Sequence, residues 1–220
     1  MRELYFAPHP DDEILGCGGT IAKHIKQGAE VYICVVTKGT EPLFKSDFIE
    51  TTRAEQKRAH QLLGTKEIIY LDFPAVMLEN QQRYVINQKI FELIERIQPD
   101  NVYIPHFGDM QKDHAIVSEA VMVAVRPKNA FKVKRVYSYE TLSETEWNVP
   151  HNSVAFLPNC FVDISDTLSD KLNALAEYRS QLSDFPSPRS LKAVDALARL
   201  RGSTVTVDAA EAFCLIREIK

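Results

Sequence analysis

The alternation of short apolar runs with longer amphipathic segments is the feature that most constrains the fold of this 220-residue chain. Four runs are short and almost continuously apolar, like strands buried on both faces of a sheet: residues 4–7, 31–36, 68–71 and 102–104. Segments of helical period lie after or between them, at residues 14–26, 48–63, 82–97 and about 113–125. This alternation predicts an α/β fold, with a Rossmann-like, mainly parallel sheet and helices on both faces.

The second half of the chain is less regular. Its strand candidates are residues 133–139, which alternate like an edge or mixed strand, and residues 161–162 and 213–216. Helices are expected over about residues 166–182 and residues 190–201, with turn-rich residues 183–188 between them. No repeat, low-complexity tract or long linker divides the sequence, so we expect one domain spanning residues 1–220.

Composition and charge exclude several classes of protein. A formal net charge of −4 argues against a nucleic-acid partner. No apolar run approaches the roughly 18 to 20 residues of a membrane span. The chain reaches Pro8 too soon for a signal-peptide core, and its four cysteines form no C-x-x-C pair. We therefore expect a cytoplasmic protein in a reducing compartment, with no disulfide framework.

A dense polar cluster, Pro8-His9-Pro10-Asp11-Asp12-Glu13, follows the first predicted strand. One imidazole and three carboxylates so close together cost electrostatic energy unless a positive group lies among them. The two prolines stiffen the turn and give His9 and Asp12 fixed directions. The alternative is a helix N-cap by Asp11 or Asp12, but a cap needs only one acid. The cluster therefore favours a cation site.

A second polar cluster follows the fourth predicted strand, at residues 105–114. His114 stands three residues before Val117 and shares the inward face of its helix. A lone histidine there would more often be a core residue with a hydrogen-bond partner. In a doubly wound sheet of order 3-2-1-4, however, the ligand crevice lies between the carboxyl ends of strands 1 and 4. The two clusters are expected to meet there.

Together, His9, Asp12 and His114 have the composition of a catalytic zinc site, with three protein ligands and an open position for water. The metal lowers the pKa of that water, and Asp11 is a remaining carboxylate that can take its proton as general base. A magnesium-dependent phosphoester hydrolase would also use clustered acids. Magnesium, however, prefers oxygen ligands over two imidazoles.

Dinucleotide binding is excluded by the first strand–helix turn. The G-x-G-x-x-G pattern needs a final glycine, but Gly16-Cys17-Gly18-Gly19-Thr20-Ile21 has Ile21 in that place. The acids of the turn would also repel a pyrophosphate. We expect these glycines to let the first helix pack close to the sheet or to the metal loop.

The motifs resemble those of the LmbE/PIG-L family of zinc-dependent N-acetylglucosaminyl deacetylases. The first is the (A/P)-H-P-D-D-E loop with a glycine-rich helix start, at residues 8–20. The second is a later H-x-D-H motif of the family, to which residues 109–114 correspond. Weaker matches occur at Arg53-Ala54-Glu55, at residues 139–141 and at residues 188–219. The resemblance runs along the whole chain and implies a Rossmann-like fold.

The resemblance also implies the site residues and the reaction. It implies His9, Asp12 and His114 as zinc ligands and Asp11 as the base that activates zinc-bound water. The expected reaction removes an N-acetyl or other N-acyl group from an amino sugar or an N-acetylglucosamine conjugate, a small-molecule partner. Relatives are often oligomeric, so a homo-oligomer is possible. The alternative is a sugar-binding or weakly active member of the family.

One position departs from the family pattern. In the family, the H-x-D-H motif begins with a histidine that is taken to stabilise the oxyanion and is also a candidate acid, but this chain has Gln111 there. A glutamine amide donates a hydrogen bond but supplies no proton. Our first hypothesis is that zinc and Gln111 hold the charge while Asp11 returns its proton to the leaving amine. In the other two, His106 reaches the site, or the activity is weakened or altered.

Arg53 is the candidate for substrate binding. It lies on the polar side of its predicted helix, and the family has an arginine there that holds substrate hydroxyls or an anionic group. The alternative is a surface arginine paired with a glutamate at helical spacing, Glu50 or Glu55. Arg189 is expected only to lie at the start of a helix, with Ser187 or Ser190 as the N-cap.

Overall fold

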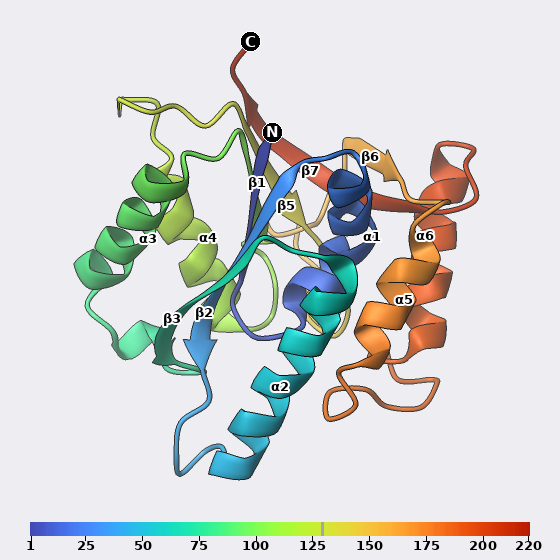
Figure 1. Cartoon of the computed structure of the whole chain (residues 1–220), viewed down its shortest axis with the longest axis horizontal. Helices are drawn as coiled ribbons and strands as arrows, with labels where there is room; N and C mark the ends of the chain where they lie inside the picture. Colours follow the sequence, from blue (N-terminus) through green and yellow to red (C-terminus); the bar gives the residue numbers. More distant parts are fainter. Residues whose placement is uncertain (129) are drawn as a thin grey trace.

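The computed structural model describes residues 1–128 and 130–220, which form a seven-stranded sheet of order β3-β2-β1-β4-β5-β7-β6 (Figure 1). The strands are β1 (Arg2–Ala7), β2 (Glu30–Lys38), β3 (Glu67–Pro74), β4 (Asn101–Pro105), β5 (Arg135–Tyr139), β6 (Cys160–Asp163) and β7 (Ala210–Glu218). The helices are α1 (Asp12–Lys26), α2 (Ser46–Leu63), α3 (Arg83–Ile97), α4 (Lys112–Ala124), α5 (Leu168–Ala176) and α6 (Leu191–Thr204), with a short 3-10 turn, η1 (Leu78–Asn80). Within the described residues, none of the helices combines the length and apolar character needed to cross a membrane.

The sheet is mainly parallel, as predicted. Strands β3, β2, β1, β4 and β5 run parallel to one another, and β7 runs antiparallel to both β5 and β6. The predicted order of the first four strands, 3-2-1-4, is confirmed. Of the two alternatives for β5, the mixed strand is correct and the edge strand is wrong, because β4 and β7 pair with its two sides.

Helices cover both faces of the sheet, which explains why the central strands are apolar throughout. Leu4 and Phe6 on β1 pack in the cluster that includes α3 and α4. Tyr5 points the other way, into the cluster that includes α1, α2, α5 and α6. Figure 1 shows these two groups of helices on opposite sides of the sheet. Each such side chain contributes about 1.5–3 kcal/mol by leaving water.

The last two helices differ in length from the prediction. A helix was expected over residues 166–182, but α5 ends at Ala176. The chain turns after it because Tyr178 donates to buried Glu13 at 2.9 Å and Ser180 to Glu55. The prediction of a serine cap for the next helix is confirmed, since the Ser190 side chain accepts the N–H of the third residue of α6.

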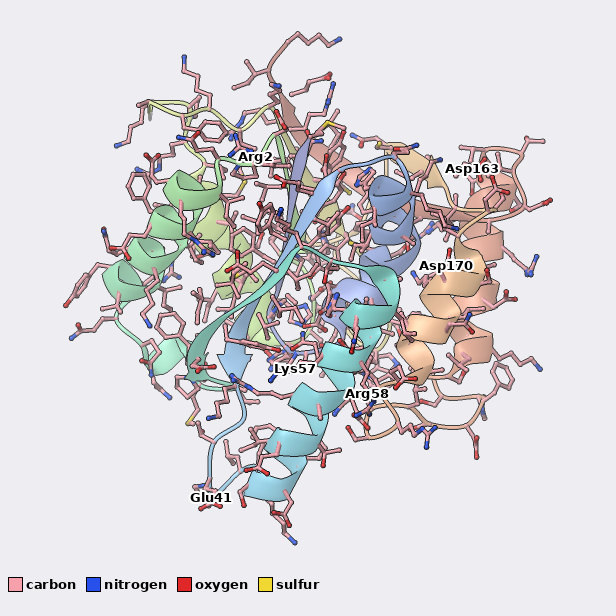
Figure 2. All side chains as sticks on the ribbon, viewed as in Figure 1. Arg2, Glu41, Lys57, Arg58, Asp163 and Asp170 are labelled. Carbon is pink, nitrogen blue, oxygen red and sulfur yellow. The ribbon has the colours of Figure 1, made fainter. Side chains whose placement is uncertain are left out.

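The glycines of α1 are explained by close packing, as predicted. A Cβ atom on Gly16 would overlap the ring of Tyr139, and one on Gly19 would overlap Ile164. At the surface, an ion pair joins α1 to α5: Lys26 Nζ lies 2.7 Å from Asp170 Oδ2. Asp170 is labelled in Figure 2. These contacts fix α1 with its N-terminus at the carboxyl end of β1.

Candidate active site

The two polar clusters meet at the carboxyl ends of β1 and β4, which are adjacent parallel strands. His9 lies in the turn between β1 and α1, Asp12 is the first residue of α1, and His114 lies in the first turn of α4. One ligand atom from each of these side chains lies within 4.8 Å of the other two. The topology therefore brings the three predicted metal ligands together.

The geometry of these three side chains suits one shared cation. His9 Nδ1 and His114 Nε2 each lie 3.3 Å from Asp12 Oδ2. Asp12 and His114 are fully buried. Among the described residues, neither Asp12 Oδ1 nor His114 Nε2 has a hydrogen-bond partner. Buried polar atoms without partners are costly, and a divalent cation would satisfy both of these.

Two further carboxylates orient the imidazoles. Asp109 Oδ2 lies 2.8 Å from His114 Nδ1, on the ring nitrogen that does not face Asp12. Asp113 Oδ2 lies 3.1 Å from His9 Nε2 and accepts a backbone N–H from the segment after β3. This is the carboxylate–histidine arrangement that fixes the ring orientation of metal ligands. The sequence analysis gave Asp109 and Asp113 no role, although both lie close to His114 in the chain.

The electrostatics of the site favour positive charge. Burial opposes ionisation of Asp12, but His114 and His9 hold its pKa well below the usual range. Burial alone would lower the pKa of His9, yet hydrogen bonds to Asp113 and Asp12 raise it to about 9. The pKa of His114 is likewise raised to about 10, chiefly by Asp12 and Asp109 against the effect of burial. Metal binding would therefore displace protons from these rings.

Asp11 is not the side-chain cap that was considered as an alternative. It occupies the N-cap position of α1 with a φ of 104°, a left-handed conformation that is costly for a residue other than glycine. Its side chain makes no capping hydrogen bond and binds the guanidinium of Arg189 instead. Burial raises the pKa of Asp11 to about 7, although Arg189 lowers it. Such strain is typical of functional sites.

Arg189 is the main site residue whose contact the sequence analysis missed. Its guanidinium binds Asp11, and its Nε donates to Ser143 Oγ at 2.8 Å. The expectation that Arg189 only begins a helix is therefore wrong. No local sequence pattern could predict this contact, because Arg189 and Asp11 are 178 positions apart in the chain.

The side chains of Gln111 and His106 are held by hydrogen bonds to different parts of the backbone. Gln111 is the N-cap of α4, where its Oε1 accepts the N–H of Asp113 at 2.6 Å. Its Nε2 then lies 3.3 Å from His9 Nε2. His106 Nε2 lies 2.8 Å from the carbonyl of Val154, and His106 does not line the cavity described below. Gln111, not His106, is the member of this pair that faces the site.

A cavity of about 310 Å³ opens next to these residues. Its polar side includes His9, Asp11, Gln111, Glu144 and Arg189. Its apolar side is formed mostly by the segment before α2 and the start of that helix, with Phe44, Phe48 and Ile49. The volume is in the range of small-molecule sites.

Arg53 also lines this cavity. Its guanidinium lies 4.2 Å from the centre of the Tyr70 ring and pairs with Asp72 of β3. The alternative pairing with a glutamate of its own helix, Glu50 or Glu55, is not the one observed for this residue. Arg53 is therefore positioned by the neighbouring strand, with its guanidinium at the cavity.

The chain is similar in sequence and in fold to known proteins. Residues 4–125 match the family model described as PIG-L, GlcNAc-PI de-N-acetylase. The chain is 30% identical over 193 residues to the diacetylchitobiose deacetylase of Thermococcus kodakarensis, covering 82% of this chain and 70% of that protein. It is 30% identical over 192 residues to a probable N-acetyl-alpha-D-glucosaminyl L-malate deacetylase 2 of Bacillus cereus, covering 81% and 82%. The structure of N,N'-diacetylchitobiose deacetylase from Pyrococcus horikoshii matches with a TM-score of 0.78 at 26% identity, covering 98% of this chain and 83% of that one.

Proposed function

Because the chain belongs to the PIG-L family of deacetylases, we propose that it is a zinc-dependent enzyme that removes the N-acetyl group from an amino sugar or an N-acetylglucosamine conjugate. The observation that carries the proposal is the convergence of His9, Asp12 and His114. Two buried atoms of this group, one on Asp12 and one on His114, have no hydrogen-bond partner in the part of the chain that the structure describes. Two imidazoles and one carboxylate suit zinc better than magnesium. Of the three side chains, His9 lines a cavity whose volume fits a small molecule, and Asp12 and His114 are buried behind it.

Asp11 is proposed as the general base. Zinc in the site would polarise the amide carbonyl and lower the pKa of a water molecule. Asp11 takes the proton of the attacking water, because its carboxylate lines the cavity and does not belong to the ligand set. With a pKa raised to about 7 by burial, Asp11 is a stronger base than an ordinary carboxylate and still ionises near neutral pH.

Gln111 is proposed as a donor to the oxyanion. Its Oε1 is occupied by the N–H of Asp113, so its Nε2 is fixed on the side of His9 and the cavity. A donor that is already oriented stabilises developing negative charge without reorganisation. This role needs only an N–H group, which glutamine supplies as well as histidine does.

Arg53 is proposed to bind the sugar. Tyr70 and Asp72 hold its guanidinium at the cavity, and the planar group has five N–H donors. Donors that are not used by Asp72 can bind substrate hydroxyls or an anionic group. The apolar side of the cavity, with Phe44 and Phe48, would contact a less polar part of the substrate.

Acetate release by the purified protein tests the proposal. The protein is stripped of metal, reconstituted with zinc or magnesium, and assayed with N-acetylglucosamine, N,N'-diacetylchitobiose and N-acetylglucosaminyl malate. We expect zinc to restore equimolar release of acetate and free amine, and the Asp12→Asn variant to show neither. Phosphate release from p-nitrophenyl phosphate with magnesium, and no acetate with either metal, would contradict the proposal.

A further inference from the structure

Amide hydrolysis requires a proton for the departing nitrogen, and the family's histidine is replaced here by Gln111. Amines are poor leaving groups unless they are protonated. His106 is held by the carbonyl of Val154 and does not line the cavity. Of the remaining acids, Glu144 lines the cavity beside Gln111 and Asp11 and does not belong to the metal site.

The loop after β5 holds Glu144 firmly in this place. Its N–H donates to the carbonyl of Thr141 at 3.1 Å, within a turn that follows the strand. The next residue, Thr145, donates through Oγ1 to Asp109 Oδ1 at 2.6 Å. Since Asp109 orients His114, the loop is tied to the same structure that positions the metal ligands.

The two oxygens of Glu144 have different surroundings. Oε2 accepts the backbone N–H of Gln111 at 3.1 Å, which fixes the carboxyl group. Among the described residues, none donates a hydrogen bond to Oε1. By contrast, the Asp11 carboxylate is bound by Arg189. Glu144 therefore lines the cavity with a carboxyl group that is fixed through Oε2, and its Oε1 is available to carry a proton.

We propose that Glu144, in place of the Asp11 expected from the sequence, is the acid that protonates the leaving nitrogen, an inference that rests on the deacetylase function proposed above. Burial raises the pKa of Glu144, as does the charge of Asp12, while His114, Arg189 and His9 act in the opposite direction. The net shift is upward, which increases the protonated fraction near neutral pH. In this proposal, Asp11 acts as the general base and Glu144 acts as the general acid.

The proton balance of the reaction is as follows. When water attacks the amide carbon, the new C–O bond forms and Asp11 takes one proton from the water. When the tetrahedral intermediate collapses, the C–N bond breaks and its electron pair takes the proton of Glu144. The products are the free amine and the carboxylic acid, which ionises to acetate. The proton on Asp11 then returns to Glu144 through solvent, which restores both groups.

A comparison of two leaving groups tests this role. Glu144→Gln keeps an acceptor for the N–H of Gln111 but has no acidic proton. Its kcat/KM for the N-acetylglucosamine conjugate that the wild type deacetylates should fall by about 10² to 10⁴. The loss on p-nitrophenyl acetate should be much smaller, because p-nitrophenolate leaves without a proton. Asp11→Asn should lose activity on both substrates, since both need an activated water.

Glu146→Gln is the matched control. Glu146 lies on the same loop and also accepts a backbone N–H, that of Ser143 at 2.6 Å, but it is exposed and does not line the cavity. This variant should behave like the wild type on both substrates, and zinc content is measured for every variant. Full amide activity in Glu144→Gln, or equal losses on both substrates, would overturn the assignment. A wild type that hydrolyses the ester but no amide would overturn the deacetylase proposal as well.

Discussion

The buried ion pair between Lys171 and Glu211 should be the most sensitive link between the C-terminal part of the chain and helix α1. Lys171 Nζ lies 2.6 Å from Glu211 Oε1, and the two side chains are only 4% and 3% exposed. Glu211 also accepts the N–H groups of Gly19 and Thr20, at 2.9 and 2.7 Å. Lys171 donates to the carbonyl of Leu15 at 2.8 Å. The pair therefore satisfies backbone groups in the middle of α1.

Lys171→Met removes the charge and leaves a side chain of similar length. The Glu211 carboxylate would then be buried without its cation, and breaking a buried pair in this way costs about 3–5 kcal/mol. For a chain of this size, each kcal/mol corresponds to a change in Tm of about 2–4 °C. We therefore expect the Tm of Lys171→Met to fall by about 6 to 20 °C.

Thermal unfolding of the metal-free protein, followed by circular dichroism at pH 7, measures this effect. Lys26→Met is the matched control, because the pair of Lys26 with Asp170 is 58% and 36% exposed. Such a surface pair contributes about 0–1 kcal/mol, so the Tm should change little. If Lys171→Met lowers the Tm no more than Lys26→Met does, the buried pair does not stabilise α1 as argued here.

Three further predictions concern the site and its supporting strand. Asp11→Asn should keep its zinc and lose about 10² to 10⁴ in kcat, because an amide does not accept the proton; unchanged turnover would exclude Asp11 as base. His114→Ala should lose zinc on dialysis while the wild type keeps it, and equal zinc content by atomic absorption would remove His114 from the ligand set. Burial raises the pKa of Glu3 from 4.5 to about 7, against a hydrogen bond from Asn101, so the folded state keeps a proton that the unfolded chain loses in this window. Glu3 by itself should therefore lower the stability of the wild type by about 3 kcal/mol as the pH rises from 4.5 to 7, and Glu3→Gln should remove that part of the pH dependence. Urea unfolding at pH 5 and pH 8 checks this, and an equal effect of Glu3→Gln at both pH values would contradict it.

Much of the fold could be predicted because its signals are local. The apolar runs of β1 and β4 and the helical periods between the strands are visible within short windows of sequence. The order of the first four strands then placed the loop of His9 beside the start of α4. The strand order and the two polar clusters together were enough to predict where His9, Asp12 and His114, the proposed metal ligands, come together.

The contacts that were missed depend on residues far apart in the chain. Arg189 stands in a turn without periodicity, and its partner Asp11 lies at the other end of the sequence. Arg53 pairs with Asp72 of β3, which helical spacing does not reveal. The end of α5 was misplaced because the contact of Tyr178 with buried Glu13 overrides a local helical pattern. In each case, a tertiary partner decides the outcome.

The central claim is that one divalent ion is held between the ends of β1 and β4. Anomalous diffraction at the zinc edge, from crystals of the zinc-loaded protein, tests it most directly. We expect one strong peak at about 2.0–2.2 Å from a nitrogen of His9, an oxygen of Asp12 and Nε2 of His114. A peak that contacts fewer than all three side chains, or no peak at this place, would show that these residues do not share a metal ion.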